Sequence, residues 1–373
     1  MKIVIIGEYS GFAKNLSDGF RALGHDCFVF SWGDGYKKIN QVNSYLIKDA
    51  KHSSRIINLL LVFVSLIENI KLKIKVYQMS KHELFDAALI MNSSFVKCGY
   101  KIWRPFFTKR MIIGLVNDPT QIYLSACGND LCFHDFWHNK SSKVSYIAQI
   151  GGGSYQIKLH LKISSFVNKV IPVMYDYAQA WRHSKYAKGW VVEPTIPLPV
   201  TVENFRVFNT RNEKLIVFHG INRPDVKGTP YILEAMKKLE KNYPDKVECI
   251  SMGGIPFTEY LEQLKRCDIS VDQTYCYYTG MNGLFSLAMG KVLLSGNIKD
   301  NEIEYGCENI PIIDIGPDAD QIYKELEKLV LDKEMVNNLS ERSRSYVESV
   351  HSSQIVAQKY INIFRGNSRP KSK

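Results

Sequence analysis

The chain contains two successive series in which short apolar segments alternate with amphipathic ones. The first series begins with KIVIIG (Lys2–Gly7) and the second with KLIVFHG (Lys214–Gly220). A continuous apolar run that ends in glycine is typical of a central strand in a parallel sheet. Because helical segments follow both runs, the pattern predicts an α/β fold with two doubly wound domains.

Further strands and helices are predicted from the same alternation. Strands are expected at 26–32, 86–92, 110–118 and 168–174 in the first series, and at 247–254, 269–273, 291–296 and 310–316 in the second. Helices of the second half are expected at about 258–266, 281–289, 319–331, 333–349 and 352–364. Between residues 120 and 165 the pattern is too weak for an assignment.

A proline-rich segment separates the two series. EPTIPLPV (Glu193–Val200) contains three prolines, which fix the backbone and remove hydrogen-bond donors, so it is expected to be a stiff connector. A chain of 373 residues suits two domains. We expect an N-terminal domain over 1–200 and a C-terminal domain over 201–350. A last segment, 351–373, would hold a helix and a disordered basic tail.

The charge of the chain favours an anionic partner. Lys and Arg number 48 against 37 Asp and Glu, a formal net charge of +11. Such a balance suits a phosphate ligand, an acidic polymer or an anionic membrane face. No basic stripe interleaved with aromatic residues is found, so nucleic acid is not an expected partner.

The cysteines indicate a reducing compartment. The eight cysteines are scattered without a CxxC pair, which is typical of free thiols in a cytoplasmic protein. Cys127 and Cys132, with His134 and His138 nearby, match no compact zinc pattern, so no metal site is predicted. The first strand follows Met1 directly, and no signal peptide is expected.

A twelve-residue apolar run, Ile56–Ile67, allows two interpretations. It is shorter than the roughly 20 residues that span a bilayer, so a helix packed on the sheet is one interpretation. The run lies between Lys48, Lys51 and Arg55 on one side and KLKIK (71–75) on the other. Apolar surface flanked by cations is also typical of an interfacial anchor, and peripheral membrane contact through 48–75 is the second interpretation.

Candidate binding residues follow the predicted strands, because ligands of open parallel sheets bind beyond the carboxyl ends of the strands. GEYSG, from Gly7 to Gly11, would let the backbone turn tightly beside a ligand. Arg223 and Lys227 share the loop that feeds the next helix, and two cations at a helix start suit a phosphate. Gly7 and Gly11 could also belong to an ordinary tight turn without a ligand. Arg223 and Lys227 could also be solvated surface charges.

Two more loops complete this set. Gly280, Met281 and Asn282 open a helix whose first N–H groups favour an anion. The segment Ser251–Phe257, with Gly253, would admit a flat base beside the backbone. Asp272 ends a strand at the same edge, although an aspartate there can also cap a turn.

Two residues are candidates for catalysis. Asp118 is expected at the end of the predicted strand 110–118, where its carboxylate would bind an acceptor or act as a base. An Asp-Pro pair is also a common turn initiator. His219 ends its strand beside the Arg223 loop and would contact the donor.

The segments LIVFHGINRPDVKGTPYILEAMKKL and DISVDQTYCYYTGMNGLFSLAMGKVLLSG resemble the donor-binding domain of GT-B glycosyltransferases, most closely the family-4 group. The resemblance implies two Rossmann-like domains facing a cleft and a C-terminal helix, 352–364, that packs back on the first domain. It implies that Arg223, Lys227 and the N–H groups of 280–282 bind the diphosphate of a UDP- or GDP-linked sugar. It also implies metal-independent transfer to a glycan or lipid-linked acceptor in bacterial surface polysaccharide synthesis, at the inner membrane face.

The chain departs from this family at one motif. The family typically has a Glu-x7-Glu pair, and the corresponding positions here are Thr279 and Leu287, or Phe285 in another register. Either Ser286, Gln273 or Asp272 recognises the ribose, or donor binding is lost. The alternatives to a transferase are therefore a non-catalytic GT-B-like subunit that binds a glycan or a partner, and a GT-B-fold nucleotide-sugar epimerase.

Overall fold

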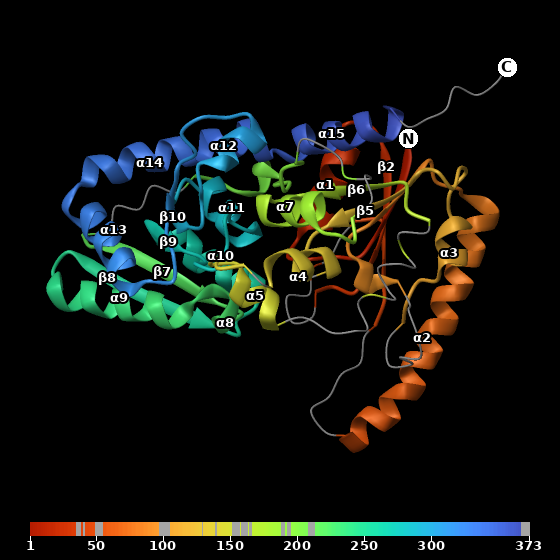
Figure 1. Ribbon diagram of the computed structural model, residues 1–373, viewed down its shortest axis with the longest axis horizontal. Helices are drawn as coiled ribbons and strands as arrows, with labels where there is room; N and C mark the ends of the chain where they lie inside the picture. Colours follow the sequence, from red (N-terminus) through yellow and green to blue (C-terminus); the bar gives the residue numbers. More distant parts are fainter. Residues whose placement is uncertain are drawn as a thin grey trace.

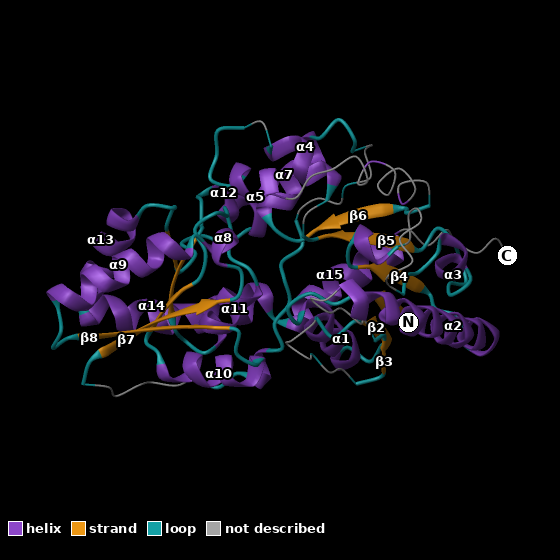
Figure 2. Ribbon diagram, turned by 90° about the horizontal axis from the view of Figure 1, so that it is seen from below, coloured by secondary structure: helices purple, strands orange, loops and turns teal. Residues whose placement is uncertain are grey.

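Two parallel sheets face each other across the middle of the molecule (Figure 1). The computed structural model describes residues 1–34, 39, 42–48, 55–96, 105–128, 130–138, 140–150, 157, 163, 166–187, 191, 195–207 and 213–366, with the backbone alone for 55–62 and 150. The predicted basic tail after residue 366 lies outside these residues. The arrowheads of the two sheets point toward each other, so the carboxyl ends of both sets of strands meet in the middle (Figure 2).

The first sheet has six strands in the order β3-β2-β1-β4-β5-β6, and every pair is parallel. Its strands are β1 (Lys2–Ile6), β2 (Asp26–Ser31), β3 (Ser44–Leu46), β4 (Ala87–Ile90), β5 (Ile122–Ala126) and β6 (Lys169–Pro172). Alternate residues of β1 point to opposite faces. Ile3 and Ile5 pack toward α1 (Phe12–Ala22) and α15 (Ser353–Gly366), and Val4 and Ile6 pack toward the other side.

That other face is covered by α2 (Arg55–His82) and α3 (Lys109–Ile113), which contribute Leu72, Val76 and Ile112 to its core. The remaining helices of this half are the 3-10 turn Ser93–Phe95, α4 (Leu131–Trp137), α5 (Ser145–Ile150) and α7 (Tyr175–His183).

The second sheet has the order β11-β10-β9-β7-β8 and is also wholly parallel. Its strands are β7 (Leu215–Ile221), β8 (Val247–Gly253), β9 (Ile269–Val271), β10 (Val292–Ser295) and β11 (Ile312–Asp314). Helices α9 (Thr229–Asn242) and α13 (Ala319–Leu331) pack on one face, and α10 (Phe257–Arg266) and α11 (Met281–Ala288) pack on the other. The other elements are the 3-10 turn Val202–Asn204, α8 (Pro224–Lys227), α12 (Asp300–Tyr305), α14 (Lys333–Tyr346) and the π-helical turn Val347–His351.

The predicted fold class is confirmed, and one predicted strand is wrong. The segment 110–118 begins as α3, because the Thr108 hydroxyl accepts a hydrogen bond from the Met111 N–H (3.3 Å) and caps a helix. Only Val116 makes an isolated bridge, to Phe85. The strand that occupies this place in the sheet is β5, within the stretch where no element was predicted.

The chain crosses between the two sheets twice, and the two crossings lie side by side. Residues 195–200 of the predicted connector are all buried. Val200 donates to the His351 carbonyl (2.7 Å), and Ser353 donates to the Val200 carbonyl (2.8 Å). After the second crossing α15 packs on α1, where a Cβ on Gly19 would lie 2.0 Å from the Ser353 carbonyl oxygen. Glycine at position 19 is therefore required for this close approach.

Candidate functional site

A cavity of about 590 Å³ lies between the carboxyl ends of the two sheets. Tyr9 and Asn92, which follow β1 and β4, line it from the first sheet, and Asn222 and Gln273, which follow β7 and β9, line it from the second. In both sheets these neighbouring strands are the pair at which the strand order reverses. Ligands of doubly wound proteins bind at such switch points, so the cavity is the candidate site.

Arg223 is the cation that the second sheet presents to the cavity. The residue is exposed, lines the cavity and stands at the start of α8. Within the described part of the chain, no acidic side chain pairs with its guanidinium. The charge acts across the cavity, because it opposes the rise in the pKa of Tyr177, a rise that burial causes. The arginine is therefore available for an anion.

Lys227 does not line the cavity with Arg223. Its ammonium group is buried and donates to the Gly220 carbonyl (2.8 Å) and to Asp272 Oδ1 (2.7 Å). The second oxygen of the Asp272 carboxylate, Oδ2, accepts a hydrogen bond from Thr279 Oγ1 (3.4 Å). The two residues form a buried ion pair that ties α8 to the end of β9, so the structure separates the two predicted phosphate-binding cations.

The start of α11 faces the cavity with free backbone donors. Gly280 and Met281 line the cavity, and the N–H groups of Met281 and Asn282 have no acceptor among the described residues. Gly280 is extended (φ −91°, ψ −170°), and a Cβ there would be 3.9 Å from the nearest atom. Gly283 serves packing, since a Cβ there would lie 2.0 Å from Thr279 Oγ1.

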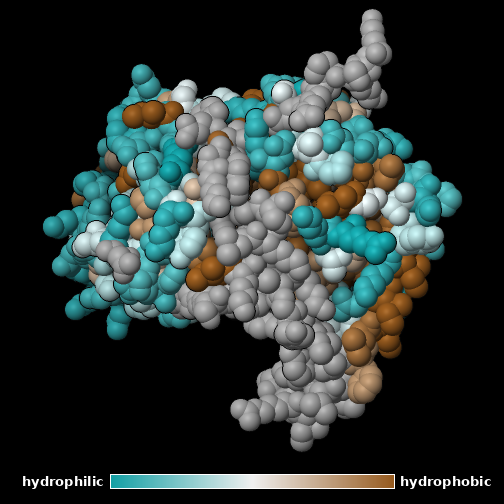
Figure 3. Space-filling model, turned by 45° about the vertical axis from the view of Figure 1, so that its right-hand side comes forward, coloured by the Kyte–Doolittle hydropathy of each residue, from teal (hydrophilic) through white to brown (hydrophobic). Residues whose placement is uncertain are grey.

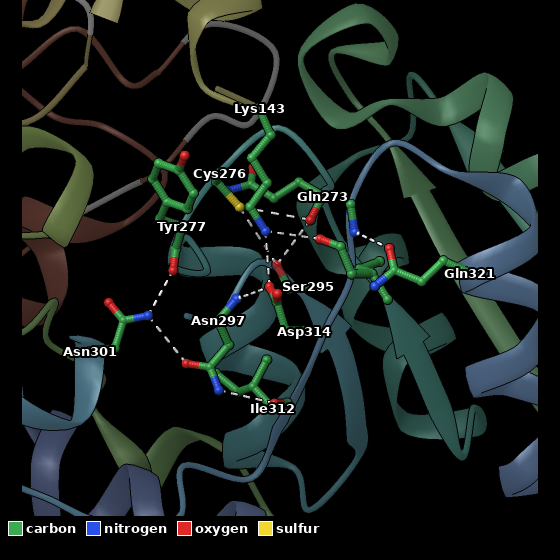
Figure 4. A network of polar contacts seen from close by, with 12 residues as sticks. Lys143, Gln273, Cys276, Tyr277, Ser295, Asn297, Asn301, Ile312, Asp314 and Gln321 are labelled. Carbon is green, nitrogen blue, oxygen red and sulfur yellow. Dashed lines mark hydrogen bonds and ion pairs between the residues drawn. The ribbon is translucent and has the colours of Figure 1, made fainter. Parts of the chain in front are cut away.

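A polar network holds the loop that leads to this helix start (Figure 4). The Tyr277 carbonyl accepts from Asn301 Nδ2 (2.7 Å), and the Tyr277 N–H donates to the Asp176 carboxylate (3.1 Å). Lys143 of the first half donates to Asp314 (2.9 Å) and lies 5.4 Å from the centre of the Tyr277 ring. The loop is thus positioned by both halves of the molecule.

A smaller cavity, of about 30 Å³, adjoins the large one at Asn222. Gly254, Tyr260 and Asn282 are among the residues that line it. The side-chain Oδ1 of Asn222 is buried and has no hydrogen-bond partner among the described residues, which is unusual for a buried polar atom. The predicted Gly253 is exposed and is not among the residues that line either cavity, and a Cβ there would be 2.7 Å from the Ile221 carbonyl oxygen.

Positions 285 and 286 face away from the cavity. The Ser286 hydroxyl is buried and donates to Ser270 Oγ (3.1 Å) in β9. Phe285 stacks on Phe205 (5.1 Å between centroids) and lies edge-on to Phe257 (5.5 Å) in the core between the two halves. Phe285, one of the positions at which the resemblance led us to expect a glutamate, is therefore part of the core between the two halves.

The Gly7–Gly11 turn lies at the cavity, but its helix start is already occupied. The buried carboxylate of Glu8 accepts from the N–H groups of Gly11 (2.9 Å), Ala13 (3.3 Å) and Lys14 (2.9 Å) at the start of α1. Burial raises the pKa of Glu8 to about 7, although the hydrogen bonds from these three N–H groups act to lower it. Gly7 (φ +114°) faces Phe95, whose ring atom lies 2.3 Å from an added Cβ.

The two residues predicted for catalysis lie outside the cavity. Asp118 accepts a hydrogen bond from the Thr120 N–H (2.8 Å) and comes just before β5, so it lies at the amino edge of the sheet. The prediction placed it at a carboxyl edge, because the segment 110–118 was expected to be a strand and begins as the helix α3. His219 is fully buried, with Nδ1 donating to the Val271 carbonyl (2.8 Å) and Nε2 accepting from Thr229 Oγ1 (2.9 Å). Burial and the Lys227 charge lower the pKa of His219 to about 4, so this imidazole is neutral.

Asp176 is a cavity carboxylate that the sequence analysis missed. It follows β6 in the first turn of α7, lines the cavity and is buried. Burial raises its pKa to about 7, while the hydrogen bond from Tyr277 and the Lys143 charge oppose the rise. The sequence did contain a signal, since Asp176 comes two residues after the predicted strand 168–174. Asp34, after β2, is the second acidic residue among those lining the cavity.

The described residues form neither a metal-binding cluster nor a membrane-spanning helix. No group of three or more His, Cys, Asp or Glu side chains is placed to hold a metal ion. None of the helices in the part of the chain that the structure describes combines the length and hydropathy needed to cross a membrane. The cysteines that it describes are free.

The chain matches no family model and no curated protein sequence. It is similar in structure to sucrose-phosphate synthase from Thermosynechococcus elongatus, with a TM-score of 0.65 and 12% identity over 98% of this chain and 99% of that chain. It is similar to HepE from Anabaena in complex with UDP-glucose, with a TM-score of 0.61 and 8% identity over 98% and 100% of the two chains. A third similar structure is a putative UDP-N-acetylglucosamine 2-epimerase from Listeria monocytogenes, with a TM-score of 0.52, 9% identity and coverages of 100% and 99%. At such low identities the likeness establishes the two-domain fold.

Proposed function

We propose that this protein transfers a sugar from a nucleoside-diphosphate sugar to the hydroxyl group of an acceptor. The observation that carries the proposal is that Arg223 and the start of α11 line the same large cavity, at the switch point of the second sheet. A cation beside a helix start provides both the charge and the donors that a diphosphate requires. The UDP-glucose complex of the similar HepE structure supports this class of donor.

The donor would lie along the second sheet. Its diphosphate would accept hydrogen bonds from Arg223 and from the Met281 and Asn282 N–H groups. Its base, uracil or guanine, would lie over the mouth of the small cavity beside Gly254, and a ribose hydroxyl or a base N–H would donate to Asn222 Oδ1, which has no partner among the described residues. This placement uses a buried acceptor that the described part of the chain leaves unsatisfied.

Catalysis would combine two effects. Arg223 and the α11 start would stabilise the negative charge that develops on the departing nucleotide. Asp176 would remove the proton of the acceptor hydroxyl, since a carboxyl whose pKa is about 7 is suited to general base catalysis near neutral pH. Lys227 would act indirectly, by holding α8 and the end of β9 in place.

The acceptor would occupy the half of the cavity that belongs to the first sheet. Tyr9, Ser94 and Asn92 line this half with uncharged polar groups, and Asp34 adds a carboxylate. Such a surface suits sugar hydroxyls better than an anionic group. We propose a glycan or lipid-linked glycan as the acceptor, in surface polysaccharide synthesis on the cytoplasmic side of a membrane.

A thermal-shift panel with UDP, GDP and their glucose and N-acetylglucosamine conjugates tests the proposal. We expect at least one nucleotide to raise the melting temperature, and the Arg223→Ala change to abolish the rise. Arg206→Ala, which removes an exposed arginine outside the cavity, is the matched control and should leave the rise unchanged. The proposal fails if no nucleotide stabilises the protein.

The packing of Phe285 favours a second candidate, a non-catalytic subunit that binds a sugar nucleotide or glycan. In that case a nucleotide would stabilise the protein, yet no candidate acceptor would cause release of free UDP or GDP. An epimerase would convert the sugar without any acceptor. Measuring nucleotide release and sugar identity with and without an acceptor separates the three functions.

A further inference from the structure

Helix α2 carries a surface that the cavity and its chemistry do not use. The helix has 28 residues and runs along the edge of the first half, away from the second sheet (Figure 1). One face packs on the sheet through Leu72, Val76 and Met79, which are 6% exposed or less. The interpretation as a helix packed on the sheet therefore accounts for this face only.

The opposite face of α2 presents apolar side chains to solvent. Phe63, Ile67, Ile70, Ile74 and Tyr77 are exposed by 66, 52, 56, 51 and 63%, respectively. Their spacings of four, three, four and three residues place them in one line along the helix, and we call them the apolar stripe. Figure 3 shows hydrophobic side chains gathered along this helix. An apolar patch of this kind on a protein surface marks an interaction site.

The charges beside the apolar stripe are all positive. Lys71 and Lys73 flank it on its two sides, and Lys75 and Lys81 follow along the helix. The only acidic residue between Arg55 and His82 is Glu68, which is buried and lies 2.8 Å from the Lys71 ammonium group. The exposed face therefore combines an apolar centre with a cationic border.

This charge pattern distinguishes two occupants. The alternating spacing of the apolar stripe would also suit a coiled coil between two copies of the chain. In that arrangement Lys71 and Lys73 occupy the flanking positions, where paired helices normally place opposite charges, and α2 offers no exposed acid to meet them. A surface of anionic lipid headgroups supplies the missing negative charge.

We propose that α2 docks this protein on an anionic lipid bilayer. The apolar stripe inserts at the boundary between headgroups and acyl chains, the lysines contact lipid phosphates, and the helix axis lies in the plane of the membrane. The surface is separate from the cavity, so this inference stands or falls independently of the proposed transferase activity.

Sedimentation of the full chain with vesicles tests the proposal. The protein should bind vesicles of 70% phosphatidylcholine and 30% phosphatidylglycerol, and bind pure phosphatidylcholine about tenfold more weakly. The double change Ile70→Glu with Ile74→Glu should lower binding to the anionic vesicles by about tenfold or more, and so should Lys71→Gln with Lys73→Gln. Raising the salt concentration should weaken the binding as well.

A matched control is available on the other half of the molecule. Ile303 of α12 is 83% exposed, and Ile303→Glu should leave vesicle binding unchanged. Thermal melts of all variants check that they fold, which is expected because the altered side chains are exposed. The proposal is overturned if anionic vesicles do not bind the protein, or if the Ile70/Ile74 variant binds like the wild type. It is also overturned if the protein is a dimer in solution that this double change dissociates.

Discussion

The starts of helices α1 and α11 face the same cavity from opposite sheets, and they differ in one respect. At α1, the carboxylate of Glu8 accepts three backbone N–H groups, those of Gly11, Ala13 and Lys14. At α11, the N–H groups of Met281 and Asn282 have no acceptor in the described part of the chain. Equivalent positions in the two halves are therefore satisfied internally in one case and left open in the other.

The difference assigns different tasks to the two halves. A helix start that already holds a carboxylate has no donors left for a second anion, and the pocket on that side adds Asp34 and Asp176. The open start of α11 lies beside Arg223 and suits a diphosphate. Under the proposed function, the donor would therefore lie on the second half and an uncharged acceptor on the first.

Of the changes considered, removing the carboxylate of Asp176 should have the largest effect, and the effect should be on the rate of transfer. We expect Asp176→Asn to lower kcat by about 10²–10⁴-fold, because the amide cannot take up the acceptor proton, while nucleotide affinity stays close to that of the wild type. Steady-state kinetics and calorimetry measure the two quantities. Asp225→Asn, at an exposed carboxylate outside the cavity, is the control. A loss of nucleotide affinity equal to the loss of rate would contradict the role of a base.

The internal cap of α1 should produce a measurable pH dependence. The pKa of Glu8 is about 7 in the folded protein and near 4.5 when unfolded, so the folded state holds this proton more tightly. The associated stability is present below pH 4.5 and is lost as the pH rises to 7, by about 3 kcal/mol. Urea unfolding of the wild type and Glu8→Gln at several pH values isolates this contribution, since other titrations cancel in the difference. Parallel curves for the two proteins would refute the assignment.

A change of Arg223 tests whether the start of α11 and its neighbouring cation bind the nucleotide. We expect Arg223→Ala to weaken UDP or GDP binding by about 10- to 100-fold, since a charged hydrogen bond contributes about 1.5–3 kcal/mol. The melting temperature without ligand should not change, because the side chain is exposed and has no described partner. Isothermal titration with Arg206→Ala in parallel provides the control, and equal affinities for the two variants would show that Arg223 does not bind the nucleotide.

The smallest effect is expected when a carboxylate is placed at the start of α11, as Glu8 is placed at the start of α1. This change compares the two helix starts most directly. Gly280→Asp would place a carboxylate at the start of α11, where the backbone is extended and a Cβ has room. We expect a gain in stability of about 0.5–1 kcal/mol and a loss of nucleotide affinity of about tenfold. Gly280→Ala, which leaves the N–H groups free, should keep the affinity. A variant with tighter nucleotide binding would disprove the phosphate assignment.

The fold was largely predictable from the sequence, because periodicity reports local structure well. The segments that indicate β1, β7 and β10, namely Lys2–Gly7, Lys214–Gly220 and Lys291–Gly296, each end in glycine and stand out from their surroundings. The exception, 110–118, has an apolar run that suits either a strand or a helix. A single Thr108 cap decides in favour of the helix. A short apolar run alone does not distinguish the two.

The site was less predictable, because chain position does not reveal which way a side chain points. Arg223 and Lys227 are four residues apart, yet one faces the cavity and the other forms a buried ion pair with Asp272. Asp176 and Asn222 could have been found from their places after predicted strands. That the Asn222 oxygen lacks a partner among the described residues depends on contacts between elements distant in sequence, and no motif encodes it.

The most direct test of the account is a crystal of the protein soaked with UDP, or with GDP if that nucleotide raises the melting temperature more. We predict density for the diphosphate within hydrogen-bond distance of the Arg223 guanidinium and the N–H groups of Met281 and Asn282, with the base beside Gly254. Density at the start of α1, displacing the Glu8 carboxylate, or an empty cavity at a saturating nucleotide concentration would contradict it.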